Sequence, residues 1–533
     1  MSRTVARRWE LTGELVAESP VHVGNIDDAI KTDLRQARDG LDRPVLPGTA
    51  LAGVIRHSLP ESVRGDKVLN PLWGRLSKKN PRGADDGTGE GSWVCVDDAV
   101  APPDTIPERR DTASIDRITG GPAQGHLFTR EILPAGTKFE FRLTVDDKET
   151  SEDSPARRLV DEIAELLVGR GVEVGGATSR GLGRVRLTHT KLRLATLNTR
   201  LGMIATLRGD YANEDLSAEK TTTPPAGVVR ITIPWRPLGP VMVAESAEGT
   251  TLQVIPKTTA KYEHKTEQRY LVIPASSIKG VFRSHTERIV RTVWQERAPD
   301  RFLAQMRGIP VVESLFGTAA DRARDRDRGR RGAVTVRECS SKVPLPARQW
   351  QAILTADLPE SATTSEDRVD KDRLARRRTQ QRIDELNASL SGKDLRFVAN
   401  THVAVDRWTG GAAEGLLFSV LEPQVTGDVW EPIVFDINVG RLDQADEALT
   451  LILLLLRDLC DGWIGFGAEI TRGMGAVRVR AKDIKFEGPA GATRPWSSVH
   501  GRNLAELLDD HDLAETLLAS WPPAQEENGS AAS

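Results

Sequence analysis

Five aspartates lie in one short segment near the start of the chain. The segment reads GNIDDAIKTDLRQARDGLDRPVLPG, and its carboxylates belong to Asp27, Asp28, Asp33, Asp39 and Asp42. A carboxylate in a loop can hold a hydrated Mg²⁺ against a phosphate or accept a proton from a hydroxyl group. The alternative interpretation is that these are solvated loop charges. Any catalysis by this chain is expected to come from this loop.

Two glycine-rich segments combine glycine with arginine. They read GGATSRGLGRVRL from Gly175 and GAEITRGMGAVRV from Gly467. Glycines let a backbone approach a ribose-phosphate chain closely, and arginines such as Arg180, Arg184 and Arg472 can pair with phosphate oxygens. The alternative is a tight turn with solvated arginines, which the segment alone favours. Repetition beside other shared motifs favours phosphate binding.

These segments belong to an internal duplication, because the same series of motifs occurs twice in the same order. Alternating apolar residues indicate a strand at residues 9–24 and again at 229–243. A proline turn that opens a helix follows in each copy, and Pro47, Gly53 and Arg56 match Pro274, Gly280 and Arg283. The strongest match joins residues 116–128 to residues 406–418, which are identical at nine of thirteen positions.

The matched segments DRITGG and DRWTGG resemble turns. Asp116 and Asp406 are expected to cap these turns with their carboxylates. For Arg117 and Arg407, a contact with nucleic acid and a surface ion pair are equally consistent with the sequence.

The order of strand, helix, strand, hairpin-like segment, helix and strand predicts an α+β fold in each copy, of ferredoxin-like (RRM-like) type. The apolar run 449–456 is expected to be a buried helix. The predicted domains are residues 1–211 and 228–489, with a linker at 212–227, a charged insertion at about 318–394, and a C-terminal helix with a disordered tail at 490–533.

Composition narrows the class of protein. A net charge of −3 gives no global sign of nucleic-acid binding. The three cysteines are far apart and lack the paired spacing of zinc or disulfide frameworks. We expect a cytoplasmic protein that does not contact membranes, because no apolar run is long enough to span one and the basic N-terminal residues lead into no apolar stretch.

The ordered motifs resemble the RAMP superfamily, and within it the backbone subunits of type III CRISPR effector complexes, as in type III-D-like systems. Residues 114–141 read SIDRITGGPAQGHLFTREILPAGTKFEF, which is similar to the family pattern IDRxTGxAxxGxLFxxExLPxGTxF. Residues 175–185 match a closing GGxxSRGxGRV-like pattern. The resemblance implies two tandem RAMP domains with thumb-like hairpin insertions. It also implies guide RNA, target RNA and other type III effector subunits as partners.

The resemblance further implies residue roles. Aligning RDGLDRPVLPG with a family pattern like DxPVxRDxxGxPxIPG puts Asp33 at the catalytic position. It would act with Mg²⁺ or another divalent metal, as the metal ligand of an endoribonuclease that cleaves guide-paired target RNA. The implied RNA contacts are Arg56, Arg117, Gly175, Gly176, Arg180, Gly181, Arg184, Lys279, Arg283, Arg407, Arg472 and Gly473.

The two copies depart from the family pattern in different ways. The first copy has Ala52 where the family usually has a lysine, whereas the second keeps that lysine as Lys279. The loop of the second copy, GTTLQVIPKTTAKYEHKTEQRYLVIP, contains no aspartate. We therefore expect the first domain to cleave RNA and the second only to bind it.

Three other functions stay open from the sequence. The chain can be a structural RNA-binding scaffold without catalysis, or a RAMP-type endonuclease that processes guide precursors. An unrelated ferredoxin-like metabolic enzyme is supported by the fold class alone.

Overall fold

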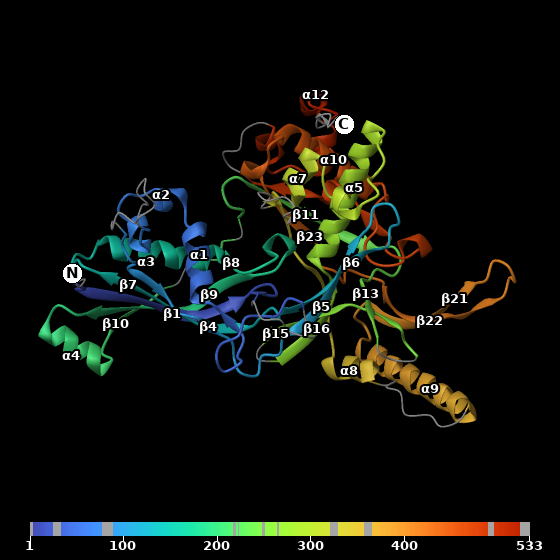
Figure 1. The fold of residues 1–533 in the computed structure, drawn as a ribbon, viewed down its shortest axis with the longest axis horizontal. Helices are drawn as coiled ribbons and strands as arrows, with labels where there is room; N and C mark the ends of the chain where they lie inside the picture. Colours follow the sequence, from blue (N-terminus) through green and yellow to red (C-terminus); the bar gives the residue numbers. More distant parts are fainter. Residues whose placement is uncertain are drawn as a thin grey trace, which may run out of the picture. The chain divides into compact units, whose positions relative to one another are not determined.

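The fold is given by a computed structural model, drawn along the chain in Figure 1. It describes residues 4–24, 33–76, 89–216, 220–221, 223–247, 251–263, 266–319, 329–355, 365–488 and 495–522. The chain divides into two compact units. The second unit begins at Thr223 and also contains two short pieces of the preceding chain, Ala113–Leu127 and Ser179–Gly181.

The first unit is built on an antiparallel sheet whose centre is strand β1 (Arg7–Ala17). This strand pairs with β7 (Lys138–Asp147) on one side and with β9 (Arg184–Thr196) on the other. Strand β3 (Val94–Val96) extends the sheet beyond β7, and β10 (Ala212–Asp215) extends it beyond β9. Alternate residues of β7 are buried, as expected where one face of a strand meets a core.

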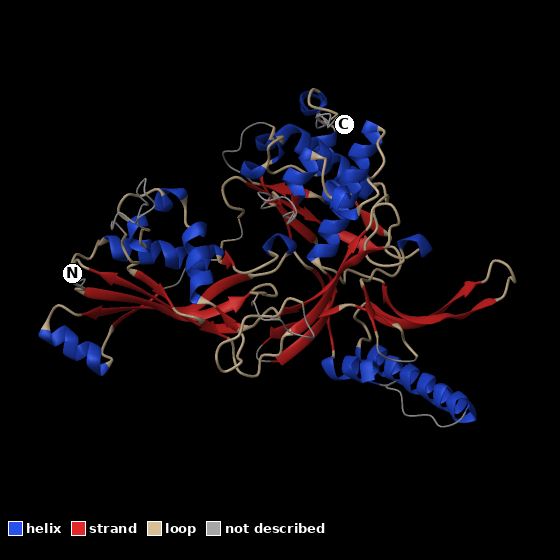
Figure 2. Cartoon of the chain, in the orientation of Figure 1, coloured by secondary structure: helices blue, strands red, loops and turns tan. Residues whose placement is uncertain are grey.

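Helices cover this sheet (Figure 2). Helix α3 (Pro155–Glu165) contacts β1 and β7 and buries Leu159, Val160 and Ile163. Helix α1 (Gly48–Ser58) begins after Pro47 and buries Leu51 and Ile55. The shorter elements are β2 (Val45–Leu46), α2 (Glu61–Arg64), β4 (Ala99–Val100), β8 (Val172–Glu173) and α4 (Arg200–Arg208), together with the paired strands β5 (Glu108–Ile115) and β6 (Pro122–Ile132).

The second unit has a corresponding sheet. Its central strand β11 (Val228–Ile233) pairs with β23 (Ile433–Asn438) and with β25 (Lys485–Glu487), and β19 (Val334–Val336) lies beyond β23. Helices α5 (Ala275–Trp294) and α10 (Ala445–Cys460) pack in its core, where Phe282 meets Phe435 edge to face at 5.6 Å. The apolar run 449–456 lies in α10 and is buried apart from the half-exposed Thr450 and Leu454, which confirms the predicted helix.

The remaining elements of the second unit surround this core. They are β12 (Trp235–Pro237), β13 (Ala244–Ser246), β14 (Val254–Pro256), β15 (Thr258–Glu263), β16 (Thr266–Ile273), α6 (Phe302–Gln305), α7 (Pro310–Phe316), β17 (Gly317–Thr318), β18 (Arg330–Arg331), β20 (Cys339–Leu345), α8 (Ala347–Thr355), α9 (Ser365–Ser389), β21 (Leu395–Val405), β22 (Ala412–Val425), β24 (Val477–Val479), α11 (Leu504–Leu508) and α12 (His511–Leu518). Among the described residues, no helix is both long enough and apolar enough to cross a membrane.

The two sheets share one order of elements. In each, the first strand of the unit lies between two antiparallel neighbours and a fourth strand lies beyond one of them, in the orders β9-β1-β7-β3 and β25-β11-β23-β19. The mixed α and β composition that the sequence predicts is confirmed.

The structure places some elements differently from the sequence-based domain boundaries. Strand β10 lies within residues 212–227, the expected linker, and pairs with β9. Strand β19 lies within the expected insertion at 318–394, yet it pairs with β23 in the central sheet and buries Val334 and Val336, so these residues belong to the domain and not to an insertion. The charged insertion contains helix α9, whose described side chains include buried Ile383 and Leu386. Residues 320–328 of that insertion lie outside the described residues.

The C-terminal region contains two short helices where one was expected. Helix α12 starts anew after α11 because the side chain of Asp510 accepts a hydrogen bond from the Leu513 N–H and caps it. The expected disordered tail after residue 522 lies outside the described residues.

Equivalent glycines make equivalent close contacts in the two units. A Cβ on Gly175 would lie 2.0 Å from the His22 carbonyl oxygen, and one on Gly467 would lie 2.1 Å from that of Met242. Both glycines have positive φ, near +85° and +93°. The repeated glycine segment is therefore needed for backbone packing inside each unit.

We expect Gly467→Ala to destabilise the chain by roughly 3 kcal/mol or more, because a left-handed backbone and a backbone clash are combined. The matched control is Gly473→Ala, whose φ of +88° is similar but whose Cβ would meet no atom within 4 Å. That control should lose only about 1 kcal/mol. Denaturant midpoints of the three proteins measure the difference, and equal losses would contradict the role of the close contact.

Candidate nucleic-acid interface

The aspartate loop lies beside strand β6. Leu34 forms a parallel backbone β-bridge with Arg130. The backbone N–H of Thr129 donates a hydrogen bond to Asp33 Oδ2 at 2.8 Å. Asp33 is exposed and, within the described part of the chain, forms no ion pair. Asp27 and Asp28 lie outside the described residues.

The other described aspartates of the loop have cationic partners. Asp39 forms an ion pair with Arg43 at 2.7 Å, and hydrogen bonds from Arg43 hold the pKa of its carboxyl below the usual value. Asp42 pairs with Arg35 at 3.4 Å and with Arg38 at 3.5 Å. Asp39 and Asp42 therefore stabilise the loop through ion pairs, whereas Asp33 forms no ion pair within the described part of the chain.

A second carboxylate meets the same threonine. The Thr129 hydroxyl donates to Asp111 Oδ1 at 2.6 Å, so Thr129 is hydrogen-bonded to both Asp33 and Asp111. Asp111 is also exposed. Sequence reasoning missed Asp111, since only its place opposite β6 in the hairpin brings it near the loop.

The described residues contain no group of three or more His, Cys, Asp or Glu side chains arranged to hold a metal. Mg²⁺, however, is commonly held by one or two carboxylates together with water and substrate phosphates. Asp33 and Asp111, which both accept hydrogen bonds from Thr129, fit that kind of site.

The glycine segment of the first unit packs on His22. Its imidazole Nδ1 is 2.7 Å from the Glu131 carbonyl oxygen, and burial followed by the charge of Arg130 lowers its pKa. The Gly176 N–H donates to the His22 carbonyl at 2.8 Å. Protein packing therefore accounts for the conformation of Gly175 and Gly176, and an RNA contact by these two stays a prediction.

Arg184 is held by an acidic partner. Its Nε donates to Glu18 at 2.8 Å, and Arg186 and Lys220 also pair with Glu18. Burial alone would raise the pKa of Glu18, but the hydrogen bonds from these three cations lower it to about 2. The guanidinium of Arg184 is thus committed to a carboxylate 166 positions away in the sequence.

Arg56, on helix α1, is exposed and donates to the Asn70 side chain at 3.0 Å. Its counterpart Arg283 on α5 is buried and donates to Glu287 and to the carbonyls of Gly317 and Met306. Matching positions in the two copies therefore have different surroundings.

Lys279 lies at the centre of a cluster of positive charge in the second unit. Its ammonium donates to the Val334 carbonyl at 2.7 Å and to that of Ser179 at 3.4 Å. Burial, followed by the charges of Arg180, Arg283 and Arg331, lowers its pKa to about 7. Burial also lowers the pKa of Arg180. Gly181 packs nearby, where a Cβ would lie 2.8 Å from that of Ala275.

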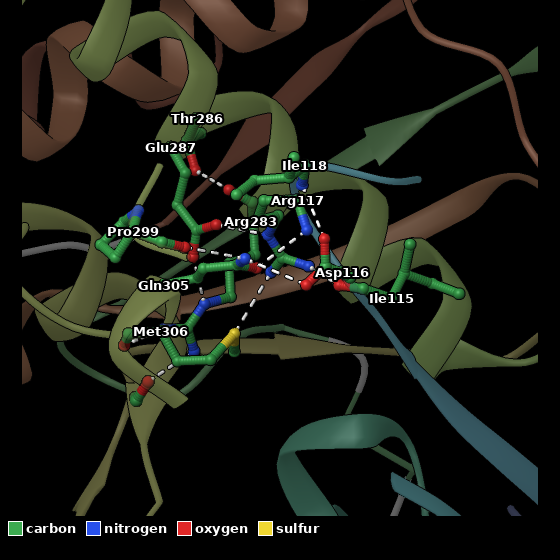
Figure 3. Close-up of polar contacts among 11 residues, drawn as sticks. Ile115, Asp116, Arg117, Ile118, Arg283, Thr286, Glu287, Pro299, Gln305 and Met306 are labelled. Atoms are coloured by element: carbon green, nitrogen blue, oxygen red, sulfur yellow. Dashed lines mark hydrogen bonds and ion pairs between the residues drawn. The ribbon is translucent and has the colours of Figure 1, made fainter. Parts of the chain in front are cut away.

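The first hairpin turn is held within the second unit (Figure 3). Arg117 Nε lies 2.5 Å from Glu287 Oε2, and the Arg117 side chain is only 13% exposed. The carboxylate of Asp116 accepts hydrogen bonds from the Ile118 and Thr119 N–H groups at 2.8 and 2.9 Å, as the predicted cap requires. For Arg117 the structure therefore shows an ion pair, although one to a buried carboxylate.

The second hairpin turn and second glycine segment are more open. Arg407 is exposed, and Trp408 is 96% exposed. Arg472 pairs with Glu469 at 3.1 Å and lies 5.7 Å from the centre of the Phe418 ring, while Gly473 has no atom near its Cβ position. Arg472, Gly473 and Arg407 are therefore accessible to a ligand.

Comparison with known proteins gives the family. The chain is 25% identical over 206 residues to the "CRISPR system Cms endoribonuclease Csm3" of Methanocaldococcus jannaschii, an alignment that covers 34% of this chain and 79% of that relative. The sequence model of the RAMP superfamily matches residues 14–186 and 256–478, which together exceed half of the 533 residues. One match falls on each copy of the duplicated series of motifs. The chain therefore belongs to the RAMP superfamily and contains two RAMP regions.

Proposed function

We propose that this chain is a guide-RNA-binding backbone subunit of a type III CRISPR effector complex that cleaves guide-paired target RNA in its first domain. The observation that carries the proposal is the pair of RAMP matches, together with an exposed Asp33 in the loop of the first copy. The similarity to a relative named as a CRISPR endoribonuclease supports the same class of activity.

Each domain has a ferredoxin-like arrangement in this proposal. The sheet orders β9-β1-β7-β3 and β25-β11-β23-β19 support it. Of the four strands taken in chain order, each sheet has the first and the third at its centre. Hairpins β5–β6 and β21–β22 are the thumb-like insertions of the two domains.

Binding of the RNA backbone is assigned to the accessible cations and to the Lys279 cluster. Arg56, Arg407 and Arg472 are exposed, and Gly473 leaves space for a close approach of the backbone. The buried ammonium of Lys279 is surrounded by further positive charge, which an RNA phosphate would offset. Arg117, Arg184 and Arg283 instead hold the protein together through carboxylates.

Cleavage requires the 2′-hydroxyl to attack the adjacent phosphorus in line with the leaving 5′-oxygen. The bond from phosphorus to the 5′-oxygen breaks and the leaving oxygen takes a proton from water, which leaves a cyclic 2′,3′-phosphate and a 5′-hydroxyl group. Asp33 is suited to accept the 2′-hydroxyl proton or to hold Mg²⁺ with Asp111, and its position is fixed by the Thr129 N–H. Bound Mg²⁺ would supply positive charge that stabilises the phosphate oxygens during the displacement.

We expect Asp33→Ala to remove one target-cleavage position from the assembled complex while RNA affinity stays within about twofold, because no phosphate-binding cation is lost. Asp33→Asn keeps an acceptor for the Thr129 N–H but loses the charge, so it should have the same effect. Gel maps of target fragments made with the same guide measure this.

Asp42→Ala is the matched control, since Asp42 is an exposed aspartate of the same loop that already pairs with arginines. It should keep every band. If Asp33→Asn also keeps every band, the chain is a non-catalytic scaffold. Cleavage of guide-precursor RNA by the isolated chain would instead identify a processing endonuclease.

The low pKa of Lys279 predicts pH-dependent RNA binding. Between pH 7 and 10.5, the ordinary pKa of lysine, Lys279 is protonated to a greater extent in the unfolded chain than in the folded chain. The free energy of unfolding that Lys279 contributes therefore falls as the pH falls through this range. A nearby phosphate favours the charged form, and RNA binding should therefore take up a proton. Affinity is expected to fall up to about tenfold per pH unit above pH 7.

Fluorescence anisotropy with a labelled guide RNA between pH 6.5 and pH 9 tests this. Lys279→Arg should flatten the dependence, because an arginine stays protonated throughout this range. Arg478→Lys, a change on the exposed side of β24, is the control and should leave the slope unchanged. Equal slopes for the wild type and Lys279→Arg would show that Lys279 does not meet a phosphate.

A further inference from the structure

The second unit contains a backbone position that corresponds to that of Asp33. Strand β14 pairs in parallel with β22 at Val254, and the aspartate loop pairs in parallel with β6 at Leu34. Asp33 and Gln253 are the residues immediately before these two pairs. Gln253 therefore occupies in the second unit the place that Asp33 occupies in the first.

The two residues accept the same hydrogen bond from the neighbouring hairpin. The backbone N–H of Ser419 donates to Gln253 Oε1 at 2.7 Å. The corresponding bond of the first unit joins the Thr129 N–H to Asp33 Oδ2 at 2.8 Å. The Ser419 carbonyl also accepts the Gln253 N–H at 3.0 Å, and the Thr129 carbonyl accepts the Leu34 N–H at 3.1 Å. Each loop is thus fixed on its hairpin through a side-chain oxygen and a backbone group.

The second carboxylate of the first site has a counterpart as well. The Thr129 hydroxyl donates to Asp111 at 2.6 Å, and the Ser419 hydroxyl lies 3.0 Å from that of Thr401. In both hairpins these partners are 18 positions apart. Three positions therefore correspond, and in the second unit an amide and a hydroxyl stand where the first unit has two aspartates.

The loss of both negative charges changes the chemistry of the site. A carboxylate can accept a proton from a 2′-hydroxyl group and attracts Mg²⁺, whereas neutral amide and hydroxyl groups are poor bases at neutral pH. Glutamine and threonine still offer acceptors and donors that suit ribose hydroxyl groups and phosphate oxygens. Glu422 supplies no replacement, because it lies on the other face of β22, where it meets His402 at 3.4 Å.

We propose that Gln253, Thr401 and Ser419 form a second target-RNA site, which holds the ribose-phosphate backbone and leaves it uncut because it has no carboxylate at residues 253 and 401. Thr401 is exposed and Gln253 is half-buried, so a strand of RNA can reach them. This inference rests on the proposed function, since target RNA must pass the second domain as it passes the first. Aspartates at residues 253 and 401 should then make the second domain cut.

The test combines Gln253→Asp with Thr401→Asp in the assembled complex and maps target fragments on gels with one guide. A new band should appear, displaced along the target from the band that depends on Asp33. Cutting at the new position should become about 100-fold faster or more, the usual effect of a positioned general base. The Asp33 band is an internal measure of folding and assembly. Adding Asp33→Asn should remove that band and leave the new one.

The matched control is Gln351→Asp with Thr355→Asp, which makes the same two exchanges on the exposed side of α8 and should add no band. Gln253→Glu is a second variant that keeps the size of the side chain and an acceptor for the Ser419 N–H. It should raise cutting at the new position roughly tenfold or more, because it adds one of the two charges. If the double variant loses the Asp33 band, Gln253→Glu decides the question.

Three outcomes separate this inference from the proposed function. Retention of the Asp33 band without a new band in either variant would overturn the second site and leave Gln253 and Thr401 as residues that only fasten the loop to its hairpin. A wild-type band that survives Asp33→Asn and is lost on Gln253→Ala would also overturn it, since the second domain would then cut without these carboxylates. A complex in which neither Asp33 nor the new aspartates give a band would count against the proposed function itself.

Discussion

Each unit depends on one strand that is paired along both edges. Strands β1 and β11 lie between two antiparallel neighbours, so their backbone groups are satisfied by hydrogen bonds on both sides. In the first unit, residues that follow β1 pair with the end of β6 and the residue after it. Val21 forms a backbone β-bridge with Leu133, and Leu34 forms one with Arg130. Asp33 is placed against Thr129 by this backbone pairing. The candidate cleavage site is therefore a consequence of the sheet.

Shared carboxylates that are buried, as Glu287 is, or half-buried, as Glu18 is, are the second organising feature. Glu287 is shared by Arg283 and Arg117, and Glu18 is shared by Arg184, Arg186 and Lys220. Removing one partner of such a group leaves a desolvated charge, which costs more than the loss of an exposed pair. Lys279 differs, because its neighbours add positive charge and lower its pKa to about 7. That imbalance is what makes the Lys279 cluster suited to an anion.

Duplication has produced two copies of each motif in unequal surroundings. The glycine turns serve the same packing in both units, since Gly175 and Gly467 each lie against a carbonyl oxygen. The arginines have diverged: Arg117 is nearly buried, whereas Arg407 is exposed. Equivalent residues of the duplicated chain therefore have different surroundings, because Arg117 lies against a buried carboxylate and Arg407 faces solvent.

The sequence by itself determined what repeats and local patterns encode. It predicted the mixed α and β composition, the buried helix in α10 and the aspartate caps of both turns, because periodicity and turn chemistry act over a few residues. It missed Asp111 and placed the buried strand β19 in an insertion. Only the tertiary structure decided which arginines are free, since the partners of Arg117 and Arg184 lie 170 and 166 positions away. Ion pairs at such separations form only when the folded backbone brings them together, and no local pattern records them.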